Sequence, residues 1–401
     1  MITRQKNLDE IKPYINNDKI KILTGIRRSG KSVFLNQIQD VLKSEYGVSN
    51  ENIISLNFES YDNQKLAQNP DDFYQYLKNR VSKIKGKVYF FFDEIQIAKD
   101  WQKIVNSLRV DFDSDIYITG SNASILSGEL ATLLSGRYVK FDIYPFSFSE
   151  FKQYSNIEND AAALQQYLNF GGMPSADIDD LDPEKTIKEL SDIYDSIILR
   201  DVSLRGGTID QNKLRVISQI LMDSVHSEIN LTNLRNRLNN AGYNISSEKI
   251  RQYVDLFKQA YMFYEINEVD IRGSQRLRTD SKFYVNDVGI MNSQINPSLK
   301  RTNLGTRLEN VVFIELLRKD FDVHFTKING KEIDFVADKK GQRSYFQVTY
   351  TMPENSQREI DNLLNIRDNY PKTLLVGIDN GRLVYEKGID VKLVSDWLLE
   401  D

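Results

Sequence analysis

The sequence predicts an α/β fold in which a doubly wound parallel sheet is followed by smaller α/β modules. Three observations support this prediction. Apolar, strand-like runs alternate with helix-like stretches through about residue 145. A glycine-rich turn at 25–32 joins the first strand-like run to a helix-like run. A strongly apolar run at 87–92 ends in two adjacent carboxylates, which is typical of a buried parallel strand.

The first element is the strand-like run at 20–24, and the turn that follows reads GIRRSGKS. It fits the pattern G-x-x-x-x-G-K-[ST] of a phosphate-binding P-loop, with a helix-like run at 33–38 behind it. Such a turn directs backbone N–H groups and a helix N-terminus at one anion. The alternative is a glycine turn that matches by chance, and both flanks argue against it. The residues expected to contact the nucleotide are Gly25, Arg28, Ser29, Gly30, Lys31, Ser32 and Val33.

The next informative element is the run at 87–92, which is followed by Asp93 and Glu94. With a P-loop upstream, we expect Asp93 and the Ser32 hydroxyl to hold Mg²⁺, and Glu94 to activate the attacking water as a general base. An ordinary strand that ends in solvated acids is the alternative, and it would be the better interpretation without the P-loop.

The remaining elements are further strands and helices of the sheet domain, followed by a helical region. Strands are expected at 52–58, 115–120 and 138–143, with helices at 101–110 and 123–135, and Pro145 ends the last strand. A polar helical region at 148–205 follows, broken by the loop 171–174.

The rest of the chain predicts two further modules. Helical stretches at about 211–225, 230–239 and 246–260 lead into β segments at 261–269 and 282–286, the make-up of a winged helix. From residue 300 onward the pattern indicates a helix, three strands, a helix and a strand.

Composition sets the class of protein. The 401 residues are 40% hydrophobic and 27% charged, as in soluble globular proteins, and the net charge of −5 excludes a nonspecific nucleic-acid binder, although a local basic patch remains compatible with it. The absence of cysteine excludes disulfides and thiolate metal sites, and two histidines disfavour a histidine-rich metal site. We find no signal peptide and no apolar run of membrane-spanning length, so we expect a cytoplasmic protein without a membrane partner.

Several of these motifs recur together in one known family. The P-loop at 25–32, the Asp93–Glu94 pair, and the stretches TGSN at 119–122, LSGR at 134–137 and YPFSF at 144–148 resemble those of prokaryotic AAA-type P-loop ATPases that carry an uncharacterised C-terminal domain. The resemblance implies ATP and Mg²⁺ as cofactors. It also implies an ATPase core at 1–150 and a helical lid at 151–205, which leaves the winged-helix-like module at 206–299 and a last domain at 300–401.

Two further site residues follow from AAA-type spacing. A polar sensor is expected where the fourth strand ends, which here is Ser121 or Asn122. An arginine finger is expected just before the fifth strand, where Arg137 lies, and such a finger reaches the nucleotide of a neighbouring subunit. This favours a homo-oligomer, whereas the alternative for Arg137 is a surface cation near a helix C-terminus.

The last domain resembles the restriction-endonuclease-like fold. Glu309 on a helix, Asp334 on a strand and Gln347 on the next strand follow the order of that fold's metal site. The motif's lysine is replaced by Thr349, which carries no charge. We therefore expect a degenerate, inactive domain.

Cations at 230–282 include Arg235, Arg237, Lys249, Arg251 and Lys258 on two helices, and Arg272, Arg276, Arg278 and Lys282 near a wing tip. They indicate either a DNA-binding surface or solvated charge.

Taken together, the sequence predicts an ATP-binding and ATP-hydrolysing switch that drives conformational change in its C-terminal modules or in a bound partner. The alternative is a nucleotide-gated DNA-binding protein or nuclease. A third hypothesis is an interaction protein that binds ATP without turnover, and the presence of Asp93, Glu94 and Arg137 counts against it.

Overall fold

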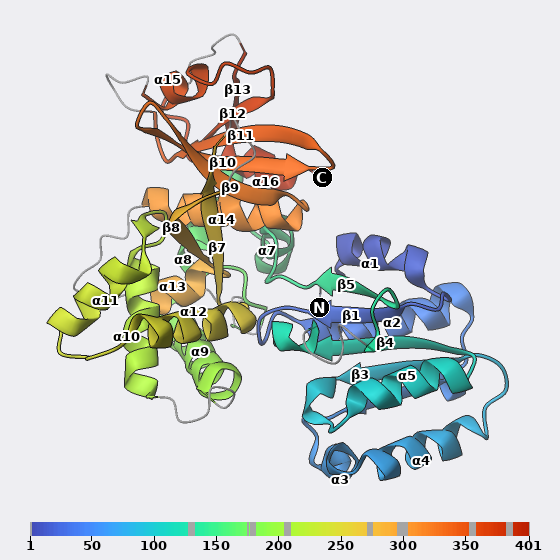
Figure 1. The fold of residues 1–401 in the computed structure, drawn as a ribbon. Coiled ribbons are helices and arrows are strands. Elements are labelled where there is room, and N and C mark those ends of the chain that lie inside the picture. Colours follow the sequence, from blue (N-terminus) through green and yellow to red (C-terminus); the bar gives the residue numbers. More distant parts are fainter. Residues whose placement is uncertain are drawn as a thin grey trace. The chain divides into compact units, whose positions relative to one another are not determined.

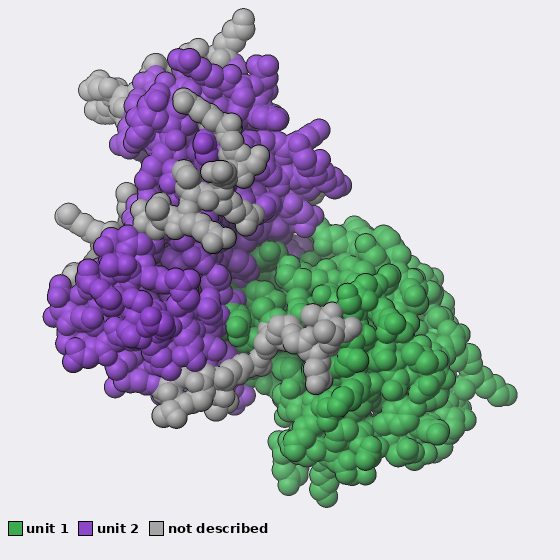
Figure 2. All heavy atoms as spheres, in the orientation of Figure 1, with its two compact units in different colours: residues 1–144, 259–261 green, residues 145–258, 262–401 purple. Residues whose placement is uncertain are grey.

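The computed structural model describes residues 2–126, 133–174, 176, 182–203, 210–270, 276–294, 304–352, 358–381 and 388–400. The chain forms two compact units, which Figure 2 shows in different colours. Unit 1 comprises Met1–Tyr144 with Gln259–Tyr261, and unit 2 comprises Pro145–Lys258 with Met262–Asp401. The four segments predicted from the sequence therefore fall into two units, with the last three segments gathered almost entirely in unit 2.

Unit 1 contains a five-stranded sheet in which every neighbouring pair is parallel, and this confirms the predicted parallel sheet. The strand order is β2-β3-β4-β1-β5. The strands are β1 Ile20–Thr24, β2 Ile53–Asn57, β3 Val88–Asp93, β4 Ser114–Gly120 and β5 Tyr138–Asp142, each within two residues of its predicted bounds. Because β4 lies between β1 and β3, the residues that follow β4 leave the sheet between the P-loop and the acidic pair.

Helices cover both faces of this sheet (Figure 1). Its side chains accordingly alternate between two separate cores. Phe90 and Phe92 of β3 belong to one core with Phe73, whereas Phe91 belongs to the other core with Phe34 and stacks on Tyr117. The helices of the unit are α1 Gln5–Ile11, α2 Lys31–Tyr46, α3 Gln64–Gln68, α4 Pro70–Val81 and α5 Trp101–Asp111. Of the helix predicted at 123–135, a short 3₁₀ turn is seen at Ala123–Leu126, and residues 127–132 lie outside the described part of the chain.

Unit 2 begins with helices on either side of the predicted break at 171–174. Ser147 and Glu150 form a capping box at the start of the first helix. The helices of this half are α7 Phe148–Ser155, α8 Asp160–Phe170, α9 Pro183–Ser196, α10 Gln211–Asp223, α11 Leu231–Asn240, α12 Ser247–Gln259 and α13 Val288–Gln294.

One eight-stranded sheet runs through unit 2 in the order β13-β12-β11-β10-β9-β7-β8-β6. It crosses the boundary predicted at 299/300, because β7 pairs in parallel with β9. The strands are β6 Glu228–Ile229, β7 Phe263–Val269, β8 Arg276–Val285, β9 Asp322–Ile328, β10 Lys331–Lys339, β11 Gln342–Thr349, β12 Lys372–Val376 and β13 Asp390–Leu393. The remaining helices are α14 Leu304–Arg318, α15 Arg358–Leu364 and α16 Val394–Leu399. β8 thus begins six residues before the predicted segment, and β13 and α16 are additional to the prediction.

The buried carboxylate of Asp287 ties together two distant segments of unit 2. Its Oδ2 accepts a hydrogen bond from the Gly172 N–H at 2.7 Å, and its Oδ1 accepts from the N–H groups of Gly289 and Ile290 at 2.9 and 3.1 Å. A Cβ on Gly171 would lie 2.1 Å from Oδ1, so glycine is required there. Burial raises the pKa of Asp287 to about 6 although the three N–H donors lower it.

No described helix combines the length and the apolar composition that a membrane span requires.

Candidate nucleotide site

The P-loop lies between the end of β1 and the start of α2, and its backbone leaves no room for side chains at the first glycine. Gly25 has φ +148°, and a Cβ there would lie 2.2 Å from the Ile143 carbonyl oxygen. Arg28 and Gly30 also have positive φ, at 65° and 95°. The loop is therefore held in the compact conformation that directs successive N–H groups to one side.

Two side chains of the loop are directed at its interior. Lys31 is buried, and its ammonium donates to the carbonyl oxygens of Gly25 and Ile26 at 2.9 Å each. The Oγ of Ser29 is buried and has no hydrogen-bond partner among the described residues. Ser32, Val33 and Arg28 are exposed at the mouth of the loop. Of the five side chains predicted to contact the nucleotide, those of Ser29 and Lys31 are thus buried, and the other three are exposed.

Arg4 supports the loop from outside the motif, and no sequence pattern predicted this contact. Its guanidinium is buried and donates to the carbonyl oxygens of Ser29 at 3.1 Å and of Tyr144 at 2.9 Å. Its backbone N–H donates to Gln37 Oε1 at 3.1 Å. The N-terminal segment is thereby fixed to the middle of the P-loop.

Asp93 lies at the end of β3 next to the P-loop helix. Its Oδ1 accepts from Thr119 Oγ1 at 2.6 Å and its Oδ2 accepts from Asn57 Nδ2 at 3.0 Å. Burial raises the pKa of Asp93, and its interactions with the Thr119 and Ser32 hydroxyls oppose that effect. The structure therefore brings together Ser32 and Asp93, the two residues that the sequence assigned to Mg²⁺.

Glu94 directly follows Asp93 and adopts a left-handed backbone conformation with φ 52°. Its N–H donates to Thr119 Oγ1 at 2.8 Å. Its Oε2 accepts from Ser121 Oγ at 3.0 Å and from the Gln96 side-chain amide. Of the two sensor candidates, Ser121 contacts Glu94, and Asn122 is buried one residue further along.

Arg137 lies at the other end of the sheet from its own P-loop. It is exposed, and its Nη1 donates to the Leu133 carbonyl oxygen at 3.2 Å and to Asn106 Oδ1 at 3.4 Å. The next residue, Tyr138, pairs with Ile20, the first residue of β1, whereas the P-loop follows the last one. At about 3.3 Å per residue, the length of β1 separates Arg137 from its own P-loop by roughly 16 Å.

A second polar cluster lies in unit 2, at the residues that resemble a nuclease site. Asp334 Oδ2 accepts from the Val348 N–H at 2.8 Å, and the Asp334 N–H donates to Gln347 Oε1 at 3.3 Å. Burial raises the pKa of Asp334 and of Glu309, and the Glu309 charge raises that of Asp334 further. Thr349 instead bonds the Thr351 carbonyl oxygen. Over the described parts of the chain, no three His, Cys, Asp or Glu side chains are grouped so as to hold a metal ion.

Lys282 of β8 belongs to this cluster and not to an exposed wing tip, so its predicted place on a DNA-binding surface is wrong. Its side chain is fully buried, with Nζ 2.5 Å from Glu332 Oε1 and 3.9 Å from Glu309 Oε1. Tyr284 donates to the same Glu309 oxygen at 2.7 Å. Burial lowers the pKa of Lys282, but the neighbouring carboxylates outweigh burial and raise it. The burial of Lys282 could not be predicted from the sequence, because β8 begins in a polar stretch.

The other predicted cations differ in exposure. Arg237 and Arg251 are exposed, Arg235 and Lys249 are half-buried, and Lys258 forms an ion pair with Glu265 at 2.6 Å. Arg272 and the side chains of Arg276 and Arg278 lie outside the described residues.

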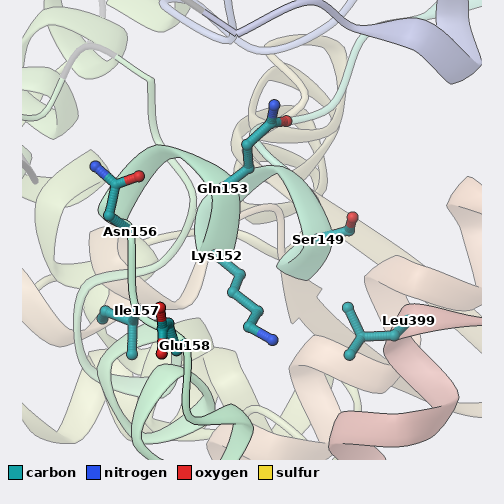
Figure 3. Close-up of a pocket in the computed structure, with 7 residues that line it drawn as sticks. All are labelled: Ser149, Lys152, Gln153, Asn156, Ile157, Glu158 and Leu399. Atoms are coloured by element: carbon teal, nitrogen blue, oxygen red, sulfur yellow. The ribbon is translucent and has the colours of Figure 1, made fainter.

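Unit 2 also has a shallow surface hollow bordered by α7, the segment that follows it, and the end of α16 (Figure 3). It is lined by Ser149, Lys152, Gln153, Asn156, Ile157, Glu158 and Leu399. Lys152 is paired with Asp160. None of the residues that the sequence assigned to chemistry lies there.

Comparisons with known proteins find two domain matches, which lie on either side of about residue 155. Residues 17–152 match the model of an AAA domain, and residues 161–301 match that of a domain of unknown function. An uncharacterised protein of Haemophilus influenzae is 42% identical over 100% of this chain and 99% of its own length. The uncharacterised protein MJ1544 of Methanocaldococcus jannaschii is 35% identical over 86% of this chain and 77% of its own length.

Among solved structures, the Aeropyrum pernix ORC1 protein in complex with DNA is similar over 73% of this chain and 92% of that chain, with 12% identity and a TM-score of 0.35. A similarity this distant does not inform function. The two sequence relatives and the AAA-domain match do identify the family. The chain belongs to a family of AAA-type P-loop ATPases that includes the Haemophilus influenzae and Methanocaldococcus jannaschii proteins.

Proposed function

We propose that this protein binds and hydrolyses ATP and uses the cycle as a conformational switch. The observation that carries the proposal is the convergence of Lys31, Ser32, Asp93 and Glu94 at the carboxyl ends of β1 and β3. Family membership supports the same activity, because AAA-type domains couple nucleotide hydrolysis to movement.

The residues of the loop fit a triphosphate. Glycine at position 25 lets the loop pack against the Ile143 carbonyl oxygen, 2.2 Å from where a Cβ would lie. The buried Ser29 Oγ, 3.3 Å from that same position, has an unused hydrogen-bonding capacity. The Lys31 ammonium, now bonded to two loop carbonyls, is the positive charge available for phosphate oxygens. The nucleotide would be held by Gly25, Arg28, Ser29, Gly30, Lys31, Ser32 and Val33.

Hard oxygen ligands suit Mg²⁺, and Ser32 and Asp93 are such ligands. When bound, Mg²⁺ would neutralise phosphate charge. Within the chain, Thr119 and Asn57 orient the Asp93 carboxylate through one hydrogen bond to each oxygen. Glu94 takes the proton of the attacking water, and Ser121 or Asn122 acts as the polar sensor.

The switch would act on unit 2 or on a bound partner. Arg137 is proposed as an arginine finger that a neighbouring copy supplies, because it lies at the end of β1 remote from its own P-loop. This proposal includes a homo-oligomer.

The test is Mg²⁺-dependent ATP hydrolysis by the full chain. Lys31→Ala should abolish ATP binding in calorimetry, with Lys43→Ala on the exposed face of α2 as the matched control. Glu94→Gln should retain ATP binding and lower turnover by about 10²- to 10⁴-fold, with the exposed Glu51→Gln as control. Unchanged ATP affinity in Lys31→Ala would refute the nucleotide site, and wild-type turnover in Glu94→Gln would identify another base.

DNA is a second candidate partner, favoured by one observation. The elements α10, β6, α11, α12, β7 and β8 follow in winged-helix order, and β6 pairs antiparallel with β8. We propose that Arg237 and Arg251 lie on the DNA-facing side of such a module. Fluorescence anisotropy with duplex DNA should show salt-dependent binding that weakens in Arg237→Ala/Arg251→Ala but not in Arg80→Ala of unit 1. Binding that is equal in both variants would exclude this surface.

We also propose that residues 300–401 form a degenerate restriction-endonuclease-like domain without nuclease activity. The motif's lysine is absent at Thr349, and the fully buried Lys282 ammonium is already occupied by Glu332. Incubation of linear and plasmid DNA with Mg²⁺ or Mn²⁺ should give no cleavage. Cleavage that disappears in Asp334→Ala would overturn the proposal.

A further inference from the structure

Two hydrogen-bond donors converge on a single oxygen of Glu94. The side-chain amide of Gln96 and the hydroxyl of Ser121 both donate to Oε2, the latter at 3.0 Å. In the described part of the chain, no hydrogen bond reaches Oε1. The carboxylate is therefore held at one oxygen and available at the other.

We propose that Gln96 is a positioning residue for the general base. Together with Ser121 it fixes Oε2 of Glu94, so that Oε1 is the oxygen that receives the proton of the attacking water. This inference rests on the proposed ATPase function and assigns a role within it to a residue outside the recognised motifs.

The orientation of the Gln96 amide is set by its surroundings. Gln96 lies on a short 3₁₀ turn, Ile95–Ile97, directly after Glu94. Its Oε1 is buried without a hydrogen-bond partner and packs against Gly120, where a Cβ would lie 2.9 Å from it. Turning the amide over would place that carbonyl oxygen against the Glu94 carboxylate, so the observed orientation is the one that the negative charge permits. An unsatisfied buried acceptor is costly, and its retention is consistent with a functional constraint.

The backbone of Glu94 is constrained as well. A left-handed φ of 52° is unfavourable for glutamate, and the Thr119 hydroxyl accepts the Glu94 N–H at 2.8 Å. Thr119 and Ser121 thus hold Glu94 from β4 and the residues after it, and Gln96 holds it from its own turn. Without Gln96, one donor remains at Oε2 and the carboxylate can rotate about its last torsion angle.

Gln96→Met tests this role because it keeps the length of the side chain and removes the donor. We expect kcat to fall roughly 10- to 100-fold, in line with the loss of one hydrogen bond to a charged group. ATP affinity should stay within about twofold. The exposed Gln68→Met on α3 is the control and should behave as wild type.

A double-mutant cycle separates positioning from a merely structural role. In the Glu94→Gln background, Gln96→Met should cause no further loss of kcat, because the group that it positions is no longer a base. Ser121→Ala removes the other donor, and it should lower kcat with ATP affinity unchanged even if Gln96→Met does not fold.

The outcomes are distinguishable. Wild-type turnover that both Gln96→Met and Ser121→Ala leave unchanged would overturn the inference alone. Fully additive losses in the double mutant would do the same, since they would indicate a structural effect. A wild-type chain that binds ATP and never hydrolyses it would overturn the proposed function and this inference together.

Discussion

Lowering the pH from 7.5 to 5 is expected to stabilise unit 2, because Asp287 binds its proton more tightly in the folded chain. Burial raises its pKa to about 6 from an ordinary value of 3.8. Between these values the folded state carries more protons than the unfolded state, so the free energy of unfolding falls as the pH rises through this window. A pKa of about 6 in place of 3.8 corresponds to about 3 kcal/mol, of which roughly half is lost between pH 5 and 7.5. Glu309 and Asp334, whose pKa values are also raised, act in the same direction.

The chain has a convenient reporter for this measurement. It contains two tryptophans, Trp101 in unit 1 and Trp397 in unit 2, so Trp101→Phe leaves a fluorophore that follows unit 2 alone. Trp397 is buried beside Phe346 and should respond to unfolding. Urea denaturation is then recorded at several pH values between 4.5 and 7.5.

Asp287→Asn provides the decisive comparison. An amide presents an NH₂ group, which cannot accept, where a carboxyl oxygen of Asp287 accepts the N–H of Gly172, or those of Gly289 and Ile290, so we expect a loss of about 1–3 kcal/mol at pH 5. The pH dependence should also weaken, whereas the exposed Asp255→Asn on α12 should change neither quantity. A free energy of unfolding that stays constant or rises from pH 4.5 to 7 in the Trp101→Phe chain would refute the reasoning.

Three further outcomes are expected. Gly25→Ala should lower ATP affinity at least tenfold in calorimetry, since its Cβ would meet the Ile143 carbonyl oxygen at 2.2 Å; equal affinity would contradict the geometry of the loop. Lys282→Met should lower the free energy of unfolding reported by Trp397 by about 1–3 kcal/mol, because it leaves the partly buried carboxylates of Glu332 and Glu309 without their counter-ion, whereas the exposed Lys331→Met should have little effect. Arg137→Ala should bind ATP but hydrolyse it more slowly, by roughly 10³- to 10⁵-fold for a full finger effect, and mixing it with Lys31→Ala should restore activity; full activity of Arg137→Ala, with a specific activity independent of dilution, would identify a surface cation.

Unit 1 could be predicted closely because its information is local. Buried parallel strands are continuous apolar runs, and the P-loop and the Asp93–Glu94 pair directly follow two of them. The contacts that organise the site could not be predicted in this way. Arg4, Asn57 and Gln96 are ordinary polar residues in the sequence, and only the strand order places them against the loop, Asp93 and Glu94.

Unit 2 was harder because its decisive interactions join distant segments. Lys282 lies in a polar stretch that is typical of an exposed turn, yet it is buried against Glu332, fifty residues later. Asp287 contacts Gly172 across an interval of 115 residues. β13 is short and amphipathic, so its pattern is weak without the neighbouring strand β12 that it pairs with.

The pairing of β7 with β9 determines where this chain can be cut. A fragment that ends near residue 300 would retain β7 with one edge unpaired, and a fragment that begins there would expose the matching edge of β9. Open strand edges of this kind recruit other chains and promote aggregation. Expression of residues 206–299 or 300–401 alone is therefore expected to give insoluble material, whereas a break between Tyr144 and Pro145 interrupts neither sheet.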